Sequence, residues 1–185
     1  RGIGAAKIEV ARLIPSRAAL ALENFTSYGN LKNPELYDAT VDRTAERVEE
    51  KIRLGEKDST QPFYYTVDLG KMLTGENRRG LFHVTIQSEH GTYVARRLIL
   101  LTDLGVIGKK STKGAFDIFV QSIANGTPVS GARVEAIGQN GEPVVAATTD
   151  ERGHAELPDI STFRREKAVQ FFMVSRGSDV SFLFP

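Results

Sequence analysis

The sequence predicts an all-β protein with two tandem antiparallel β-sandwich domains. Short runs of alternating apolar and polar residues recur about every 8–12 residues with turn signals between them, a spacing typical of β-sandwiches. Hydrophobic residues make up 41% of the 185-residue chain and charged residues 25%, which suffices for packed cores and argues against a disordered chain. The length fits two sandwiches of about 80–100 residues each.

The first domain is expected over residues 1–103, where several strands follow alternating patterns. Ile8 and Val10 alternate with charged residues, which predicts a strand over Lys7–Ile14. Further strands are expected at Ala18–Phe25, Phe63–Leu69, Leu81–Gln87 and Thr92–Leu101. The last two should form a hairpin around a tight turn at 89–91. Loops are expected at Tyr28–Asp38, Gly55–Pro62 and Gly75–Gly80.

The segment Thr44–Leu54 fits two structures. Helical spacing is seen in three of its apolar residues, Ala45, Val48 and Ile52. Its Glu and Lys content also favours a helix. Glu50, Ile52 and Leu54 would equally share one face of a strand, and the flanking segments are strands. We therefore expect a strand here, with a helix as the open alternative.

The end of the first domain is marked by four consecutive apolar residues, Leu98–Leu101. A continuous apolar run is typical of a strand buried on both faces. Thr102–Gly108 and the polar stretch Lys109–Lys113 follow, before alternation restarts at Phe116. We place the domain boundary near Asp103.

The second domain, residues 104–185, is expected to be a meander of short strands. Asn140-Gly141 lies between the strand-like runs Ala132–Gly138 and Pro143–Thr149, and it favours a type I′ hairpin turn because both residues tolerate positive φ. Asp150–Gly153 has Asp first and Gly fourth, as a type I turn prefers. The other strands are expected at Ala115–Ser122, His154–Leu157, Ala168–Ser175 and Val180–Phe184.

The three histidines show no catalytic or metal-binding pattern. His83 is expected to point outward from its strand, and His90 and His154 lie in or beside turns. Metal ligands come in close pairs, which these spacings do not provide. Asp150 precedes His154 by four residues, but no nucleophile elbow accompanies them to complete a Ser-His-Asp triad. We expect no catalytic, cofactor-binding or metal residue.

Charged and polar motifs have simple structural interpretations. Glu46–Arg53 carries both signs and is expected to form a solvated face. Arg78-Arg79 and Arg96-Arg97 are able to bind an anion but are interpreted as aids to solubility. Asp150–Gly153 has too few oxygen ligands for calcium. Asn24-Phe25-Thr26 matches a glycosylation sequon, a pattern common by chance. The net charge of +1 is balanced along the chain, so nothing suggests nucleic acid or an anionic membrane as a partner.

Cysteine is absent from the sequence, which excludes disulfides, zinc–thiolate sites and thiol chemistry within it. No apolar run approaches the about 18 residues of a transmembrane helix. The chain begins with Arg1, and no signal-peptide pattern precedes the first strand, so we expect a piece of a longer protein.

Two stretches resemble the macroglobulin-domain region of bacterial alpha-2-macroglobulins. They are LILLTDLGVIGKK, residues 98–110, and the segment Phe116–Leu157. In that family one sandwich ends in a strand running into a Thr-Asp-Leu-Gly segment, here Thr102–Gly105. The next sandwich has a Gly-x-Pro-Val-x-Gly-Ala-x-Val hairpin entry, here Gly126–Val134. A Thr-Thr-Asp-x-x-Gly turn follows, here Thr148–Gly153.

The resemblance implies macroglobulin/fibronectin-like sandwiches, with the residues before Leu98 forming a preceding macroglobulin domain. Such domains are non-catalytic structural parts of a broad-spectrum protease inhibitor, a protease trap with a role in defence or colonisation. The family's thioester needs a Cys, which this chain lacks, so no catalytic residue is carried over and no cofactor is expected.

The resemblance also implies partners and a location. The expected partners are other macroglobulin domains of the parent chain, proteases through the full-length protein, and other periplasmic proteins. Nucleic acid and membrane insertion by this piece are not expected. The implied location is the periplasm, either free or with the parent chain anchored to the inner membrane.

Two alternative interpretations come from different classes. The hairpin entry and the Asp-x-x-Gly turn also occur in Ig-like and transthyretin-like modules, so a pair of such modules from a bacterial surface adhesin is the main rival. An accessory sandwich of a secreted enzyme is the third interpretation, and it requires a neighbouring catalytic domain. A very long parent chain with many different sandwiches favours the inhibitor, whereas an array of near-identical repeats favours the adhesin.

Overall fold

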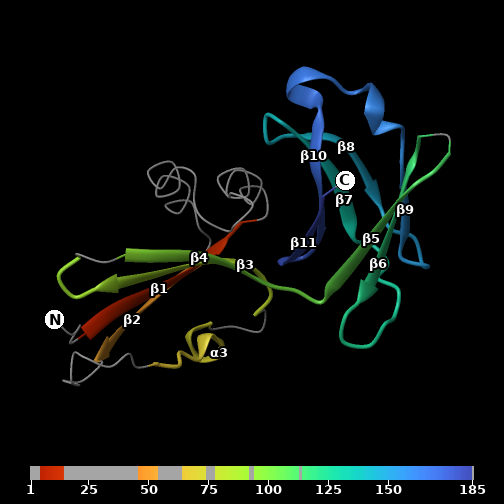
Figure 1. Cartoon of the computed structure of the whole chain (residues 1–185). Helices are drawn as coiled ribbons and strands as arrows, with labels where there is room; N and C mark the ends of the chain where they lie inside the picture. The colour runs from red at the N-terminus through yellow and green to blue at the C-terminus, as the bar shows by residue number, and fades with distance from the viewer. Residues whose placement is uncertain are drawn as a thin grey trace.

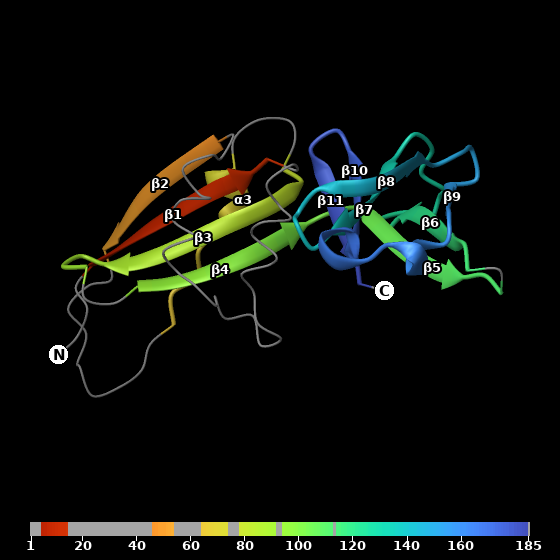
Figure 2. The ribbon, with the colours of Figure 1, turned by 90° about the horizontal axis from the view of Figure 1, so that it is seen from above.

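The computed structural model describes residues 5–14, 46–53, 64–73, 78–91, 94–112 and 114–184. Within these ranges the fold is all-β and antiparallel, as expected from the sequence, and its strands form three sheets. One four-stranded sheet, the N-terminal sheet, lies beside a pair of sheets, the C-terminal sandwich (Figure 1). Figure 2 shows the same two parts from above, joined by the chain that passes from β4 (Val94–Leu101) to β5 (Leu104–Lys110).

The N-terminal sheet has the strand order β2-β1-β3-β4. Its other strands are β1 (Ala5–Leu13), β2 (Glu46–Arg53) and β3 (Gly80–Ser88). The central strand β1 pairs antiparallel on both sides, so Val10 lies opposite Val48 of β2 and Val84 of β3. The ambiguous segment Thr44–Leu54 is therefore a strand over its residues 46–53, because pairing with β1 overrides its helical propensity.

A short helix packs on one face of the N-terminal sheet. α3 (Leu69–Met72) follows Asp68, whose side chain accepts a hydrogen bond from the Gly70 backbone N–H at 3.0 Å. Met72 and Leu73 are buried against apolar side chains of the sheet, namely Ile8, Val10, Ile52, Phe82 and Val84. The helix therefore supplies the apolar cover for this face in the described part of the chain.

The strand predicted over Phe63–Leu69 is wrong in its described part. Residues 64–68 belong to no strand, and α3 begins at Leu69. The alternation of apolar and polar residues does not reflect a strand here. Tyr64 is almost fully exposed, and Val67 and Leu69 pack onto the sheet without pairing to a strand. A capped helix start at Asp68 replaces the expected strand end.

β4 is an edge strand, and its apolar run is not enclosed. Leu98 and Ile99 are half-buried, while Leu100 and Leu101 are more than one third exposed. The prediction of two-sided burial is wrong, because β3 is the only sheet neighbour of β4 among the described strands. The β3–β4 hairpin itself is confirmed, since the two strands pair along nearly their whole lengths.

The C-terminal sandwich consists of two antiparallel sheets, with the orders β5-β6-β9 and β11-β10-β7-β8. Its strands after β5 are β6 (Phe116–Ser122), β7 (Arg133–Gly138), β8 (Pro143–Thr148), β9 (His154–Leu157), β10 (Val169–Arg176) and β11 (Asp179–Leu183). These six confirm the strands predicted after the boundary. The core between the sheets includes Ile118, Val120, Val134, Leu157, Phe172 and Val174.

β5 is a strand that the sequence pattern does not predict. Its sequence, LGVIGKK, contains two glycines and ends in two lysines, so alternation is weak. Pairing with β6 forms it nonetheless, from Leu104 opposite Ser122 to Lys110 opposite Phe116. The Leu183 side chain of the facing sheet packs over Gly108, so a Cβ at this position would force that side chain to shift.

The Asn140-Gly141 hairpin forms, but its predicted type I′ turn is wrong. Gly141 has a φ of +76°, whereas among described non-glycine residues only Arg165 has a positive φ. The Gly141 N–H donates to the Gly138 carbonyl, and the Gly138 N–H donates to the Glu142 carbonyl, both at 2.9 Å. This is a type I turn closed by a glycine bulge, and a separate register shift between β7 and β8 lies between Ala136 and Ile137.

The turn Asp150–Gly153 is confirmed. The Gly153 N–H donates to the Asp150 carbonyl at 3.0 Å, and the Asp150 carboxylate accepts from the backbone N–H groups of Arg152 and His154, each at 2.9 Å. These bonds, the one from His154 foremost, hold the pKa of Asp150 below its ordinary value. Gly153 has a φ of +71°, and a Cβ there would run into the Val120 carbonyl.

Some predictions fall outside the described residues. They are the strand Ala18–Phe25, the loops Tyr28–Asp38 and Gly55–Pro62, the sequon at Asn24, and the first half of the turn Gly75–Gly80. Across the ranges that are described, no helix has the length and apolar character needed to span a membrane.

Candidate functional site at the junction of the two parts

The N-terminal sheet and the C-terminal sandwich meet through a buried apolar cluster, here called the junction cluster. Its members are Ala11, Leu13 and Leu81 of the sheet, and Ile137, Phe171, Met173 and Val180 of the sandwich. Leu98 and Phe182 pack at its margin. Full burial of one large apolar side chain contributes about 1.5–3 kcal/mol, so this cluster stabilises the association of the two parts.

Alternation along β10 explains how one sheet serves two cores. Phe172 and Val174 belong to the core of the sandwich, whereas Phe171 and Met173 belong to the junction cluster. All four side chains are buried. The run of apolar residues that is buried on both faces therefore lies in β10 rather than in β4. Strand β7 behaves in the same way, because Ile137 belongs to the junction cluster while Val134 and Ala136 belong to the sandwich core.

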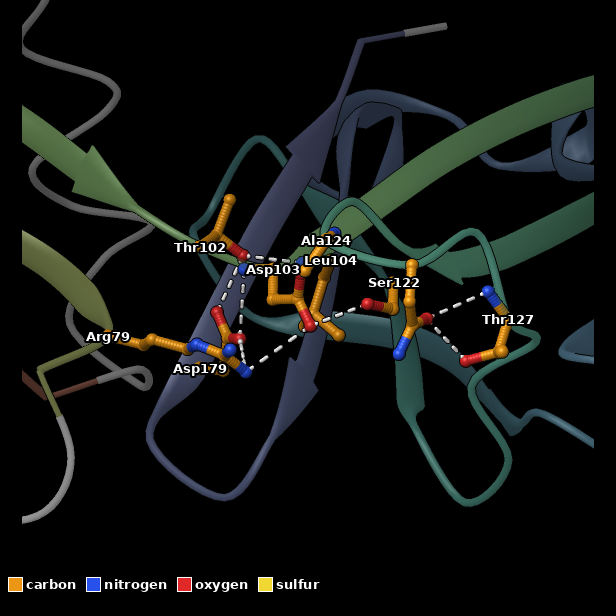
Figure 3. Close-up of polar contacts among 9 residues, drawn as sticks. Arg79, Thr102, Asp103, Leu104, Ser122, Ala124, Thr127 and Asp179 are labelled. Atoms are coloured by element: carbon orange, nitrogen blue, oxygen red, sulfur yellow. Dashed lines mark hydrogen bonds and ion pairs between the residues drawn. The ribbon is translucent and has the colours of Figure 1, made fainter.

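Polar contacts hold the chain where it passes from β4 to β5 (Figure 3). Asp179, the first residue of β11, has a side chain only 7% exposed. Its carboxylate accepts a hydrogen bond from Thr102 Oγ1 at 2.6 Å and another from the Asp103 backbone N–H at 3.1 Å. Thr102 Oγ1 in turn accepts from the Leu104 N–H at 3.0 Å. Both residues of the link are thus bound by β11.

Asp103 ties the same link to the turn after β6. Its carboxylate accepts hydrogen bonds from Ser122 Oγ and from the Ala124 N–H, both at 2.8 Å, and its carbonyl accepts from the Ile123 N–H at 2.8 Å. The Ser122 hydroxyl is the largest cause that holds the pKa of Asp103 below its ordinary value. The side chain and the backbone of Asp103 are therefore both held by the sandwich.

Arg79 brings a positive charge from the N-terminal sheet to these carboxylates. Its Nη1 lies 3.5 Å from Oδ2 of Asp103 and 3.5 Å from Oδ2 of Asp179. The side chain of Arg79 is 51% exposed, so water screens each ion pair and its contribution is modest. Its position between two carboxylates also offsets their mutual repulsion. Arg79, just before β3, thus connects the N-terminal sheet to the link and to β11.

The same residues line a cavity of about 390 Å³ at the junction. The rest of its lining is Leu104, Ser122, Asn125, Thr127, Pro128, Val129 and Arg176. Asn125 Oδ1 accepts from the Thr127 N–H at 3.0 Å and from its hydroxyl at 2.7 Å, which fixes the turn after β6. The hydroxyl of Ser122 and the carboxylates of Asp103 and Asp179 in this lining take part in the hydrogen bonds that hold the link between the two parts.

Neither His83 nor His90 lines this cavity. His83 is 2% exposed, so the prediction that it points outward is wrong. It lies in β3, an inner strand of the N-terminal sheet, and both faces of β3 are buried over the residues around it. His90 is exposed in the turn between β3 and β4, as expected.

His154 does not form a triad with Asp150. The Asp150 carboxylate binds the backbone N–H of His154, while the imidazole Nε2 lies 2.9 Å from Oδ1 of Asp117. The ring also stacks on Phe119, with centroids 4.9 Å apart. In the part of the chain that the structure describes, no group of three His, Cys, Asp or Glu residues is placed to hold a metal ion.

Sequence reasoning missed the residues that form the junction. Arg79 was assigned to solubility, whereas it forms ion pairs with both carboxylates. Asp179 carries no local signal, because its partners lie more than seventy residues earlier. A usable signal was the polar pair Thr102-Asp103 set between two apolar runs, since buried polar residues at a strand-to-strand link need hydrogen-bond partners.

A family model and curated relatives resemble this chain. The model of the bacterial alpha-2-macroglobulin MG3 domain matches residues 101–184. Alpha-2-macroglobulin of Rickettsia conorii is 29% identical over 192 residues, and that of Pasteurella multocida is 30% identical over 201 residues. These alignments cover 98% and 96% of this chain but 10% of each relative. The chain thus spans about a tenth of the length of the curated relatives it matches.

Solved structures share the fold. Native alpha-2-macroglobulin from Escherichia coli spanning domains NIE-MG1 matches with a TM-score of 0.69 at 18% identity, covering 99% of this chain and 84% of that one. A longer piece spanning MG0-NIE-MG1 matches with a TM-score of 0.68 at 17% identity, covering 99% of this chain and 55% of that one. These matches extend over both the N-terminal sheet and the C-terminal sandwich.

Proposed function

Because the chain belongs to the bacterial alpha-2-macroglobulin family, we propose that its macroglobulin-like domains are non-catalytic structural parts of a broad-spectrum protease inhibitor that traps its target. The division into domains at residues 1–103 and 104–185 is part of this proposal. It is supported by the change of sheet between β4 and β5, and by the family-model match that begins at residue 101.

The junction is the observation that carries this proposal. A protein that encloses another needs walls whose neighbouring parts keep a fixed geometry. Here the parts share a buried apolar cluster, and the link Thr102-Asp103 is bound by Asp179 and Ser122. Adhesin modules that act independently would be joined by an exposed, flexible linker with few contacts across it. The arrangement therefore favours a wall over a string of modules.

The same proposal names partners and a location. Other macroglobulin domains of the parent chain are the direct partners, and proteases are engaged through the full-length protein, in defence or colonisation. The periplasm is the proposed compartment, together with other periplasmic proteins as neighbours. The greater length of the relatives supports the first point, and the family resemblance alone supports the compartment.

The test uses the full-length parent protein and an elastase-type protease. A trapped protease should lose cleavage of a large protein substrate, which is sterically excluded, and should keep cleavage of a small peptide, which diffuses in. Equal loss of both activities would identify an active-site inhibitor instead. Unchanged cleavage of both substrates would show that the parent does not inhibit this protease. Either result contradicts the trap.

A second arm tests whether the structural role is non-catalytic. The isolated segment should neither hydrolyse substrates nor inhibit the protease, because two small β-units are not large enough to enclose an enzyme. Stoichiometric loss of cleavage with the segment alone would make it an inhibitor in its own right and would overturn the structural role.

A further inference from the structure

The outer face of the sheet β5-β6-β9 presents large apolar side chains to solvent. Ile107 of β5 and Phe119 of β6 lie opposite each other and are 64% and 38% exposed. Ile123, just after β6, is 64% exposed. A Cβ added at Gly105 would lie 3.4 Å from Ile123 Cγ1, which places Ile123 over the next outward position of β5. We call Ile107, Phe119 and Ile123 the outer apolar patch.

Charged side chains of both signs border this patch. Lys109, Asp117 and Glu156 form one row across the three strands, next to Phe119 and Ile107. His154 stacks on the Phe119 ring and lies 2.9 Å from Asp117, which holds the ring in place. An apolar centre within a mixed polar rim is the composition of a protein–protein interface. The mixed signs do not fit a nucleic acid or an anionic membrane.

The patch is continuous with the junction already described. The backbone N–H groups of Ile123 and Ala124 donate to Asp103, so the residue that fixes the link also fixes one end of the patch. The opposite outer face of the sandwich also carries large apolar side chains, and another part of the chain covers them. There Phe171 and Met173 also point away from the sandwich core, and the N-terminal sheet buries them.

We infer that the outer apolar patch is the docking surface for another domain of the same polypeptide, outside these residues. The inference rests on the proposed function and names a partner surface for it. Three apolar side chains fall short of the about 1,600 Å² that a specific association of separate proteins usually buries. A tethered domain needs less, because the tether raises its effective concentration to about millimolar. This favours a domain of the same chain over a second copy.

Photo-cross-linking in the full-length parent protein tests this surface. The photoreactive residue p-benzoyl-phenylalanine replaces Ile107 in one variant and Ile123 in another, and cross-linked peptides are identified by mass spectrometry after irradiation. We expect both variants to link to a peptide outside this segment and to migrate as monomers. The same probe at Glu151, an exposed turn residue, should give no specific link. At Phe182, beside the junction cluster, it should reach the N-terminal sheet.

Two results would overturn the inference. Cross-linked dimers would identify a second copy as the occupant. Absence of any specific link from Ile107 and Ile123, while the Phe182 control reacts, would show that the patch is bare. Protease assays on the same preparation separate this failure from that of the proposed function. A parent that protects a large substrate without the cross-link contradicts only the docking surface, and a parent with the cross-link that fails to protect contradicts only the trap.

Discussion

The two sheets of the C-terminal sandwich differ in what lies on their outer faces. In the sheet β11-β10-β7-β8, the strands β10 and β7 have buried side chains on both faces, while the sheet β5-β6-β9 is buried on one face. Composition does not explain this, because each outer face carries a phenylalanine: Phe171 is 2% exposed and Phe119 is 38% exposed. Because the N-terminal sheet completes the cover of one face, we expect the cooperative unfolding unit to extend beyond the sandwich.

The largest expected effect compares these two aromatic residues directly. Phe171→Ala removes a ring from the junction cluster and should lower the free energy of unfolding by about 3–5 kcal/mol, because it leaves a cavity. Phe119→Ala should lower it by about 1–2 kcal/mol, since the ring is already partly in water. Urea denaturation of the two variants measures the difference. Equal losses would show that the two outer faces are energetically alike.

A second comparison concerns two glycines with positive φ, one before β9 and one before β7. Gly153 and Gly131 have φ values of +71° and +73°, but only a Cβ at Gly153 would meet backbone, at the Val120 carbonyl. Gly153→Ala should therefore lower the free energy of unfolding by about 2–4 kcal/mol, and Gly131→Ala by about 1–2 kcal/mol. Thermal denaturation of both variants checks this order. A reversed order would mean that the turn at Gly153 moves freely and does not constrain the sheet.

The polar part of the junction should contribute less than its apolar part. Asp179→Ala leaves the Thr102 hydroxyl and the Asp103 N–H without their acceptor, which should cost about 1–3 kcal/mol. Unfolding should then separate into two transitions, one for each part, when followed by calorimetry. Glu156→Gln, on the exposed outer face, is the matched control and should keep a single transition. A single transition in Asp179→Ala would show that the junction cluster alone couples the unfolding of the two parts.

The smallest effect concerns acid. The pKa of Asp103 is lowered from its ordinary value of 3.8, with the Ser122 hydrogen bond the largest cause. A depressed folded-state pKa stabilises the fold above the unfolded-state pKa, and this stabilisation is lost as pH falls through the folded-state value. The free energy of unfolding should therefore be level near neutral pH and fall below about pH 4. Asp103→Asn should make this acid slope shallower, as measured by denaturation at several pH values.

Asp150 and Asp159 share the lowered pKa, so Asp103→Asn should remove only part of the acid slope. An unchanged slope in this variant would show that protonation of Asp103 does not contribute to the loss of stability in acid.

Sequence alone predicts the strands whose alternation reflects one buried face. β6 and β9 are examples, because Ile118, Val120, Ala155 and Leu157 face one core while their neighbours face outward. The same logic fails for β5, whose two glycines weaken the pattern, and for residues 64–68, where burial comes from packing without pairing. Local patterns report burial, but they do not report which neighbour provides it.

The junction could not be predicted from local sequence patterns for a related reason. The Leu98–Leu101 run predicted a strand enclosed on both faces, but an edge position depends on the topology of the whole sheet. Asp179 is buried because Thr102 and Asp103 satisfy it from a distant part of the chain. The chain changes sheet beside Asp103, but no local pattern indicates that Asp179 binds this link.

The long reach of Asp179 sets an order of events during synthesis. It follows its partner Thr102 by 77 positions, so this part of the link is bound only after β11 has left the ribosome. Likewise one side of β1 stays unpaired until β3 is made, since Ala6 pairs with Ser88. Contacts between distant segments form slowly, because the chain loses the entropy of loop closure before the contacts stabilise the fold. Until then, Leu13 and Leu81 lie bare at the end of a finished sheet, and this interval is when the nascent chain most needs protection from aggregation.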